Sequence, residues 1–280
     1  MLRVRILASL IVISQFVFAQ EYQPVERYTI ADGLPHSSIT CLYTDSRGLL
    51  WIGTSDGLSR YNGVSFYNYQ ANLYDTISLP NDRILGLSED ESGNIWCLTP
   101  VALCKYVPRF DGFKSYYAYP ENTDHNSPIR FKDFSMDKAG GKIYLLGDRF
   151  IGEFDMNSEI IKVLKTNESE TSDLISIFKS FDFQSSSQSL LINEFTQILI
   201  YNLRSDSITH QEIPTRGTFK IAAGKGDEYF IFTEDKIWIH SGNNTFQELN
   251  TNISELKINS PIVDVLSKED DQIEIITENN

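Results

Sequence analysis

The sequence has few of the side chains that carry catalysis, redox chemistry or metal binding. Its 280 residues include 4 histidines, which are spread along the chain at His36, His125, His210 and His240. No HExxH, GxSxG, P-loop or GxGxxG motif occurs, and calcium-binding loops of the DxDxDG type are absent as well. We therefore predict no catalytic residues, no metal site and no cofactor in this chain.

Basic side chains are also scarce. The chain has 24 lysines and arginines against 38 aspartates and glutamates, which gives a formal net charge of -14. A surface of this sign repels phosphate backbones and anionic lipid headgroups. We therefore expect no nucleic acid partner, and the simplest role of the charge is solubility.

Long apolar runs are missing except at the N-terminus. Residues 6–17 form one apolar run that follows Arg3 and Arg5 and ends in Val17-Phe18-Ala19. This pattern is typical of a secretory signal peptide cleaved near Ala19, and its apolar core is shorter than the roughly 20 residues that cross a bilayer. An N-terminal membrane anchor is the alternative. We expect residues 1–19 to be removed and residues 20–280 to form a periplasmic or otherwise exported domain.

The three cysteines are odd in number and form no CxxC pair, which argues against a disulfide framework or a zinc site. Cys41 shares a predicted strand face with Ile39 and Tyr43, which is typical of a buried thiol. Cys97 and Cys104 flank one predicted hairpin turn. They can pair in an oxidising compartment only if the hairpin register places them opposite each other. The sequence does not fix that register, so the pairing stays open here.

A repeated four-strand unit organises the rest of the chain. Its first copy, residues 32–70, has four short apolar or alternating runs joined by tight turns, including the hairpin signal Asn62-Gly63. Such a meander must bury both faces against something of similar size. A second copy, residues 81–119, repeats Trp51 as Trp96 and Gly48 as Gly93 at the same offset. The meander therefore has its own repeats as partners.

Weaker copies follow at residues 129–164, 174–213, 219–249 and, in part, 261–280. Repeats of about 40 to 45 residues with four short strands are the sequence form of a β-propeller. We predict an all-β propeller of four-stranded antiparallel blades, with about five and a half blades present and the ring incomplete, as in an N-terminal fragment of a longer protein. Residues 24–30 are expected to add an orphan outer strand. The second-strand side chains are expected to pack between blades rather than to form a ligand platform: Trp51, Trp96, Tyr144, Leu191 and Phe230.

Residues 38–63 resemble the two-component regulator propeller repeat. The matching positions are Asp45, Gly48, Leu50, Trp51, Ile52, Gly53, Thr54, Gly57, Leu58, Arg60, Tyr61 and Gly63. The second unit keeps the positions Asp90, Gly93, Ile95, Trp96, Thr99, Leu103, Lys105 and Tyr106, but has Leu98 and Ala102 where the repeat has glycines. Later units keep only the apolar pattern.

In that family the propeller is the periplasmic sensor of hybrid two-component histidine kinases, often from Bacteroidetes-type bacteria. The resemblance therefore implies a non-catalytic ligand-sensing or interaction module of signal transduction. It suggests an oligosaccharide as ligand, a homodimer as one assembly, and membrane contact only through regions downstream of this chain. Two alternatives remain. One is a free-standing scaffold of the envelope or secretion machinery, and the other is a propeller carbohydrate lyase or hydrolase, which needs paired carboxylates or clustered histidines at the channel.

A binding site on such a scaffold is expected in the loops at the mouth of the central channel. In a four-stranded blade, the loop entering the inner strand and the loop joining strands two and three share one face. Here these loops are residues 34–37, 55–57, 81–83 and 100–102. They give five candidate ligand-binding residues: His36, Ser37, Asp56, Asp82 and Arg83. The alternative is that these are exposed loop residues without a ligand.

Overall fold

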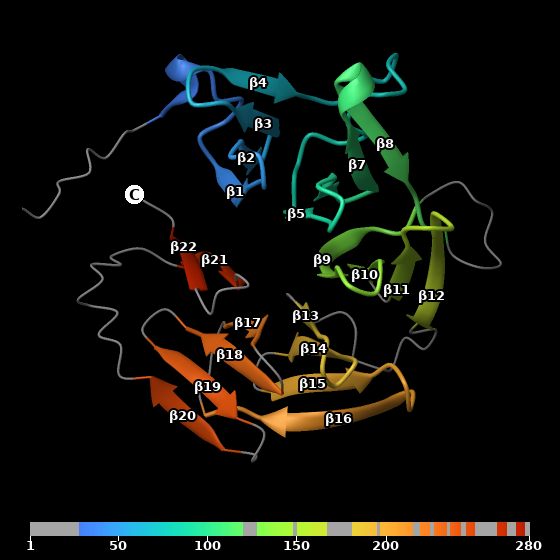
Figure 1. The fold of residues 1–280 in the computed structure, drawn as a ribbon, viewed down its shortest axis with the longest axis vertical. Coiled ribbons are helices and arrows are strands. Elements are labelled where there is room, and N and C mark those ends of the chain that lie inside the picture. The colour runs from blue at the N-terminus through green and yellow to red at the C-terminus, as the bar shows by residue number, and fades with distance from the viewer. Residues whose placement is uncertain are drawn as a thin grey trace, which may run out of the picture.

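The strands form antiparallel sheets arranged around a common centre (Figure 1). The computed structural model describes residues 28–119, 128–147, 150–166, 181–194, 197–214, 219–224, 227–233, 236–241, 245–249, 262–267 and 273–277. The predicted signal peptide lies outside these ranges. In the part that the structure describes, no helix is long and apolar enough to cross a membrane.

In the described ranges, five sheets have four strands each, and each follows the chain from an inner to an outer strand. Blade 1 consists of β1 (Ile39–Thr44), β2 (Leu50–Thr54), β3 (Gly57–Tyr61) and β4 (Phe66–Tyr69). Blade 2 consists of β5 (Gly86–Glu89), β6 (Ile95–Leu98), β7 (Leu103–Val107) and β8 (Gly112–Tyr116). Blade 3 consists of β9 (Phe131–Asp137), β10 (Lys142–Gly147), β11 (Phe150–Asp155) and β12 (Ile160–Thr166). Blade 4 consists of β13 (Phe181–Gln184), β14 (Ser189–Glu194), β15 (Gln197–Asn202) and β16 (Ser207–Glu212). Blade 5 consists of β17 (Lys220–Ala223), β18 (Glu228–Phe232), β19 (Ile237–Ser241) and β20 (Phe246–Leu249).

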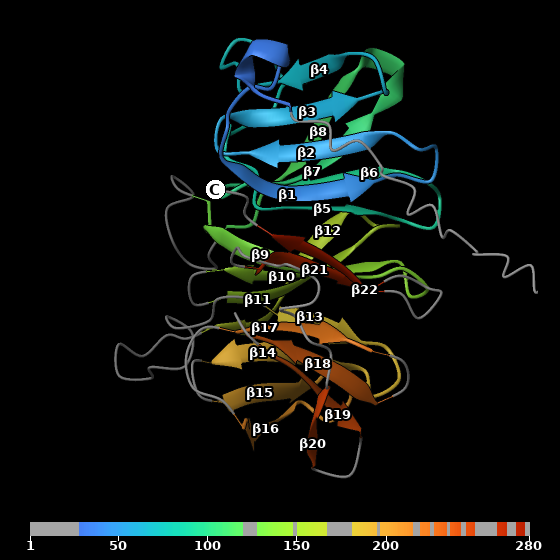
Figure 2. The ribbon, with the colours of Figure 1, turned by 90° about the vertical axis from the view of Figure 1, so that its left-hand side faces the viewer.

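The sixth position holds a sheet of two strands, β21 (Ile262–Ser267) and β22 (Ile273–Thr277). β21 contacts both β17 and β1, and Figure 2 shows the pair between blade 5 and blade 1. No complete blade therefore closes the ring among the described residues. The predicted propeller of about five and a half blades is confirmed.

The first turn of blades 1 and 2 is built around one aspartate. Asp45 accepts the backbone N–H groups of Arg47 at 3.0 Å and Leu49 at 2.9 Å, and also the Nε1–H of Trp51 at 3.0 Å. Asp90 repeats the arrangement with the Nε1–H of Trp96 at 2.8 Å. Aspartate favours such turns because its carboxylate satisfies backbone donors two and four residues on. The motif thus joins the turn to the buried indole that follows it.

Two motif glycines are required by close approach. At Gly53 a Cβ atom would overlap Cys41 Sγ, and at Gly57, where φ is +123°, it would lie 2.8 Å from the carbonyl oxygen of Tyr69. Side chains are therefore excluded at both positions. The turn glycines of the motif also have positive φ: Gly48, Gly63 and Gly93.

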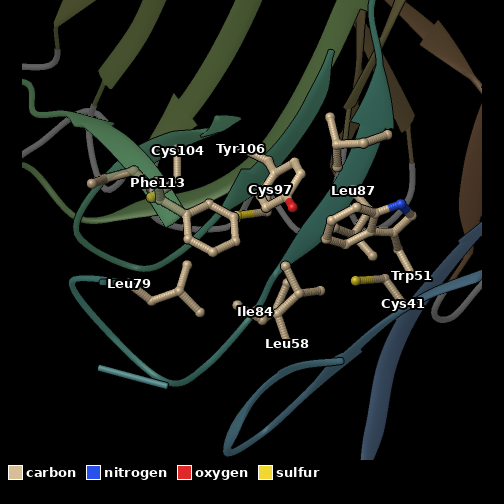
Figure 3. Packing of buried hydrophobic residues seen from close by; sticks show 12 residues of the cluster. Cys41, Trp51, Leu58, Leu79, Ile84, Leu87, Cys97, Cys104, Tyr106 and Phe113 are labelled. Carbon is tan, nitrogen blue, oxygen red and sulfur yellow. Dashed lines mark hydrogen bonds between the residues drawn. The ribbon is translucent and has the colours of Figure 1, made fainter. Parts of the chain in front are cut away.

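Aromatic and aliphatic side chains fill the spaces between neighbouring blades. Trp51 is fully buried between blades 1 and 2, and Figure 3 shows this cluster. Trp96, Tyr144 and Leu191 are buried between the next three pairs of blades. These four therefore pack as predicted. Phe230 is only half-buried.

Acidic residues at the outer turns of blades 2, 3 and 4 connect each of these blades to the one before it. Asp111, in blade 2, accepts the hydroxyl hydrogens of Tyr69 and Tyr106, both at 2.6 Å, and contacts Arg60 at 3.4 Å. Glu159, in blade 3, accepts from Tyr116 at 2.7 Å and pairs with Lys114. In blade 4 the same role falls to Asp206, which binds Tyr201 and Lys165. All three acids have φ near +50°, a conformation that aspartate tolerates better than most residues. We call these three groups the rim ties.

The predicted orphan strand is wrong for the residues that the structure describes, 28–30. Ile30 begins a short 3-10 helix, η1 (Ile30–Asp32), because Thr29 and Asp32 form a capping box at its start. Tyr28 packs against Tyr61 and Phe66, with its hydroxyl 2.7 Å from that of Tyr61. This segment thus lies on the outer edge of blade 1 rather than beside β22. Residues 24–27 lie outside the described ranges.

Candidate functional site

Three segments distant in sequence meet at one end of blade 1. The backbone N–H of Ser55 donates to Ser38 O at 3.1 Å, and that of Gly57 donates to Asp82 O at 2.7 Å. Asn68 donates its side-chain N–H to Gly33 O at 2.7 Å, which holds the first segment against β4. The loops predicted to share a face therefore do so in blade 1. We call residues 34–38, 55–57 and 70–83 the blade 1 loop surface.

Two of the five predicted side chains accept a hydrogen bond from a backbone N–H group. Asp82 is half-buried, and its Oδ1 accepts the backbone N–H of Ala71 at 2.6 Å. His36 is half-buried, and its Nδ1 accepts the backbone N–H of Ser38 at 2.9 Å. Both side chains therefore shape the loops, since each satisfies a backbone donor that no strand partner reaches.

The other three predicted residues are exposed: Ser37, Asp56 and Arg83. The amide of Gln70 donates to Asp56 O at 3.1 Å, which fixes the turn that carries the Asp56 carboxylate. The backbone N–H of Arg83 donates to Asn81 Oδ1 at 3.0 Å. The surface therefore presents a hydroxyl, a carboxylate and a guanidinium group from three connected loops.

The corresponding loop of blade 2, residues 100–102, adds no polar side chain to the candidate site. The carbonyl of Pro100 accepts the N–H of Phe131 at 2.9 Å, which joins this turn to blade 3 in the way that blade 1 is joined to blade 2. Ala102 is fully buried. Residues 100–102 offer no polar side chain, so the candidate site belongs to blade 1.

The sequence reasoning missed the most exposed part of this surface. Leu73 and Tyr74 are 98% and 99% exposed at the tip of the connection between β4 and β5. The loop is held by Ser78, whose hydroxyl accepts from Asn72 N at 3.0 Å and donates to Asn72 O at 2.9 Å. It is anchored by Ile77 O, which accepts the N–H of Phe113 at 2.7 Å. The signal was an apolar pair between two turn-forming residues, Asn72 and Asp75.

The exposed polar side chains of the surface are hydrogen-bonding groups. Within the described ranges, no group of three or more His, Cys, Asp or Glu side chains is placed to hold a metal ion. Asp56 and Asp82 are neighbours, but the Asp82 carboxylate already accepts a backbone N–H. A donor, an acceptor and an exposed tyrosine ring can instead hydrogen-bond and stack with a ligand rich in hydroxyl groups.

Comparison with known proteins finds a described repeat in blade 1. The sequence profile of the family "Two component regulator propeller" matches residues 33–56. The chain carries a two component regulator propeller repeat. The repeat includes two of the three segments of the blade 1 loop surface, residues 34–38 and 55–56, while residues 70–83 follow it.

One relative with a similar sequence is a much longer protein. Histidine kinase P4 of Formosa agariphila is 38% identical over 66 residues, which is 24% of this chain and 4% of the kinase. The chain thus corresponds to a small part of that relative's length.

Solved structures support the fold. The extracellular domain of a hybrid two component system from B. thetaiotaomicron is 22% identical, with a TM-score of 0.68 over 91% of this chain and 34% of that chain. Virginiamycin B lyase from Staphylococcus aureus is 18% identical, with a TM-score of 0.56 over 78% of this chain and 71% of that chain. At these identities the likeness shows the propeller architecture alone.

Proposed function

We propose that the chain is the exported, periplasmic sensing propeller of a two-component signal transduction system, non-catalytic in this segment. It binds a small hydroxyl-rich ligand such as an oligosaccharide at the blade 1 loop surface. The observation that carries the proposal is the 38% identity to a histidine kinase over 66 residues, together with the propeller repeat at residues 33–56. The N-terminal apolar segment with Ala19 at its end supports export.

The side chains of the surface support an uncharged, hydroxyl-bearing ligand. Arg83 supplies donors, Asp56 supplies an acceptor and Ser37 supplies both, while the Tyr74 ring offers an apolar face for stacking. The chain is acidic overall, with a formal charge of -14, which disfavours a polyanionic ligand. Hydrogen-bonding groups on loops fixed by a rigid sheet are the usual basis of such recognition.

The test is binding of the purified chain, residues 20–280, to a panel of neutral and acidic oligosaccharides on an array, followed by titration calorimetry of the strongest binder. We expect Arg83→Ala to weaken binding at least about tenfold, which is the loss of one good polar contact at about 1.4 kcal/mol per factor of ten. Arg204→Ala is the matched control. Arg204 is also exposed and also donates its backbone N–H to an asparagine two residues earlier, but it lies in the β15–β16 turn at the other end of a blade.

Equal loss of affinity in Arg83→Ala and Arg204→Ala would contradict the proposed location. Absence of binding to every oligosaccharide on the array would contradict the ligand class. The stability of each variant is checked by its melting temperature, which both substitutions should leave within about 2 °C because exposed side chains contribute little.

A further inference from the structure

All three cysteines of the chain lie in one core, between blades 1 and 2. Cys41 comes from β1, Cys97 from β6 and Cys104 from β7, and their exposed fractions are 2%, 0% and 0%. Figure 3 shows them among Trp51, Leu87 and Phe113. No disulfide joins them in the structure. Two thiols of one hairpin and a third from the preceding blade therefore lie within one apolar cluster.

The register of the β6–β7 hairpin answers the question that the sequence left open. Cys97 lies directly opposite Cys104. The N–H of Thr99 donates to Ala102 O at 2.9 Å, so Thr99 and Ala102 are a hydrogen-bonded pair, and alternation along the ladder makes Cys97 and Cys104 another. Cα atoms in such pairs are about 5.5 Å apart, which lies within the Cα range of disulfide-bonded cysteines, while their Cβ atoms must move closer together to reach the roughly 4 Å of a disulfide. The Cys97 thiol already shares a hydrogen bond with Cys104, so the two sulfur atoms are neighbours.

We infer that Cys97 and Cys104 are an oxidation site, at which a cross-strand disulfide forms within blade 2. The oxidant is a small-molecule or protein disulfide, such as oxidised glutathione or an oxidised dithiol–disulfide oxidoreductase. Each cysteine loses its hydrogen and the two sulfur atoms join. The two electrons reduce the S–S bond of the oxidant, and the two protons leave on its two thiols. An exported protein meets such oxidants routinely.

Because Cys97 and Cys104 are buried in the folded chain, their oxidation is limited to the period before the blades pack together. Cys97 and Cys104 are enclosed once blade 1 packs on blade 2, so an oxidant reaches them only while the blades are apart, as during folding. A hydrogen bond with Cys104 and burial both raise the pKa of the Cys97 thiol well above its usual range in the folded chain. Because the thiolate is the reactive form, the folded pair exchanges slowly in either direction.

Cys41 is the third thiol and the internal control. Its strand partner across the β1–β2 ladder is Gly53, and its sulfur lies so close to Gly53 that a Cβ there would overlap it. Within its own sheet Cys41 faces no cysteine, and its neighbour Cys97, whose pKa it helps to raise, belongs to the next blade. We expect Cys41 to remain a thiol when Cys97 and Cys104 are joined.

The test is refolding in a glutathione redox buffer. The reduced, denatured chain, residues 20–280, is refolded in mixed reduced and oxidised glutathione, then denatured with N-ethylmaleimide and digested with trypsin. Cleavage after lysine and arginine places Cys97 and Cys104 together in residues 84–105 and Cys41 in residues 28–47. We expect residues 84–105 without maleimide and two hydrogens lighter, and residues 28–47 with one maleimide.

Two controls accompany it. In Cys97→Ser the remaining Cys104 should carry one maleimide, and in Cys41→Ser the disulfide in residues 84–105 should still form. A chain folded under reducing conditions and then placed in the same redox buffer should keep three thiols for much longer, since the pair is buried. Two maleimides on residues 84–105 after refolding, or a disulfide that includes Cys41, would overturn the inference.

Discussion

The hydrogen bond between Asp45 and Trp51 gives the sharpest prediction about the fold. Trp51 is fully buried, and its Nε1–H donates to Asp45 Oδ2 at 3.0 Å, while Oδ1 accepts the backbone N–H groups of Arg47 and Leu49. Asp45→Asn can keep the Oδ1 contacts, but it places an NH2 group where Oδ2 accepted from the indole and from the Arg47 guanidinium, whose Nη2 lies 2.8 Å from Oδ2. A buried donor then faces another donor.

The loss of stability in Asp45→Asn can be estimated from the type of hydrogen bond that is removed. Hydrogen bonds to charged groups contribute about 1.5–3 kcal/mol, and a buried donor left without an acceptor costs about 1–3 kcal/mol. We therefore expect Asp45→Asn to lower the free energy of unfolding by about 2–3 kcal/mol. In a double-mutant cycle, Trp51→Phe removes the donor, so Asp45→Asn should cost at least about 1 kcal/mol less in that background.

Urea unfolding followed by far-UV circular dichroism measures these differences without depending on Trp51 fluorescence. Asp90→Asn in blade 2 should cost a similar amount, because Trp96 Nε1 lies 2.8 Å from Asp90. Asp56→Asn changes an exposed carboxylate and should stay within about 0.5 kcal/mol. A cost for Asp45→Asn as small as that of Asp56→Asn, or the same cost with and without Trp51, would refute the reasoning.

Three further predictions concern pH, backbone and a buried histidine. Burial raises the pKa of Asp45, but hydrogen bonds from Trp51, Leu49 and Arg47 outweigh it and lower that pKa below its usual value. Its contribution to stability is therefore present above the unfolded pKa of about 3.9 and lost as the pH falls through the folded value, so acid unfolding curves of Asp45→Asn should be flatter below about pH 4. Gly57→Ala should destabilise the chain more than Gly63→Ala in thermal melts, since both have positive φ but only at Gly57 would a Cβ meet a backbone atom, Tyr69 O, at 2.8 Å. His240 is buried against Tyr229 with both ring nitrogens unpartnered, and burial lowers its pKa. The folded chain therefore keeps its full stability above the unfolded pKa of about 6.5 and loses stability as the pH falls below it, because protonation favours the unfolded chain. His240→Phe should melt at a higher temperature than the natural chain at pH 5, and its melting temperature should change less between pH 7 and pH 5. Identical pH profiles for the two proteins would contradict this assignment.

Local features of the sequence predicted most of blade 1. The Asn62-Gly63 turn and the spacing of Gly48 and Trp51 are set by interactions within a few residues, so the pattern was sufficient for the strands. The inter-blade role of Trp51 also followed from the sequence, because a side chain repeated once per blade must meet the next blade.

The rim ties could not be predicted in the same way. Asp111 followed by Gly112 is an ordinary turn signal, and nothing local shows that its carboxylate meets Tyr69 and Arg60 of the previous blade. Their proximity depends on how blades pack. The same holds for Asp82, which as a loop residue was predicted to meet a ligand, while its carboxylate accepts the N–H of Ala71.

The exposed pair Leu73 and Tyr74 shows a third limit. Apolar residues in a connecting segment are most simply read as packing residues, and their exposure appears only when the hydrogen bonds of Ser78 and Asn72 define the loop. In contrast, the cysteine question needed a single fact, the register of one hairpin, and sequence patterns seldom fix register.

Hydrogen–deuterium exchange tests most directly whether a ligand binds at the blade 1 loop surface. Exchange is measured for residues 20–280 with and without the oligosaccharide that binds most strongly on the array. We predict slower exchange in residues 34–38, 55–57 and 70–83, and unchanged exchange in the turns at the other end of the blades, such as residues 45–49 and 203–206. Protection confined to those opposite turns, with none at residues 70–83, would contradict the account.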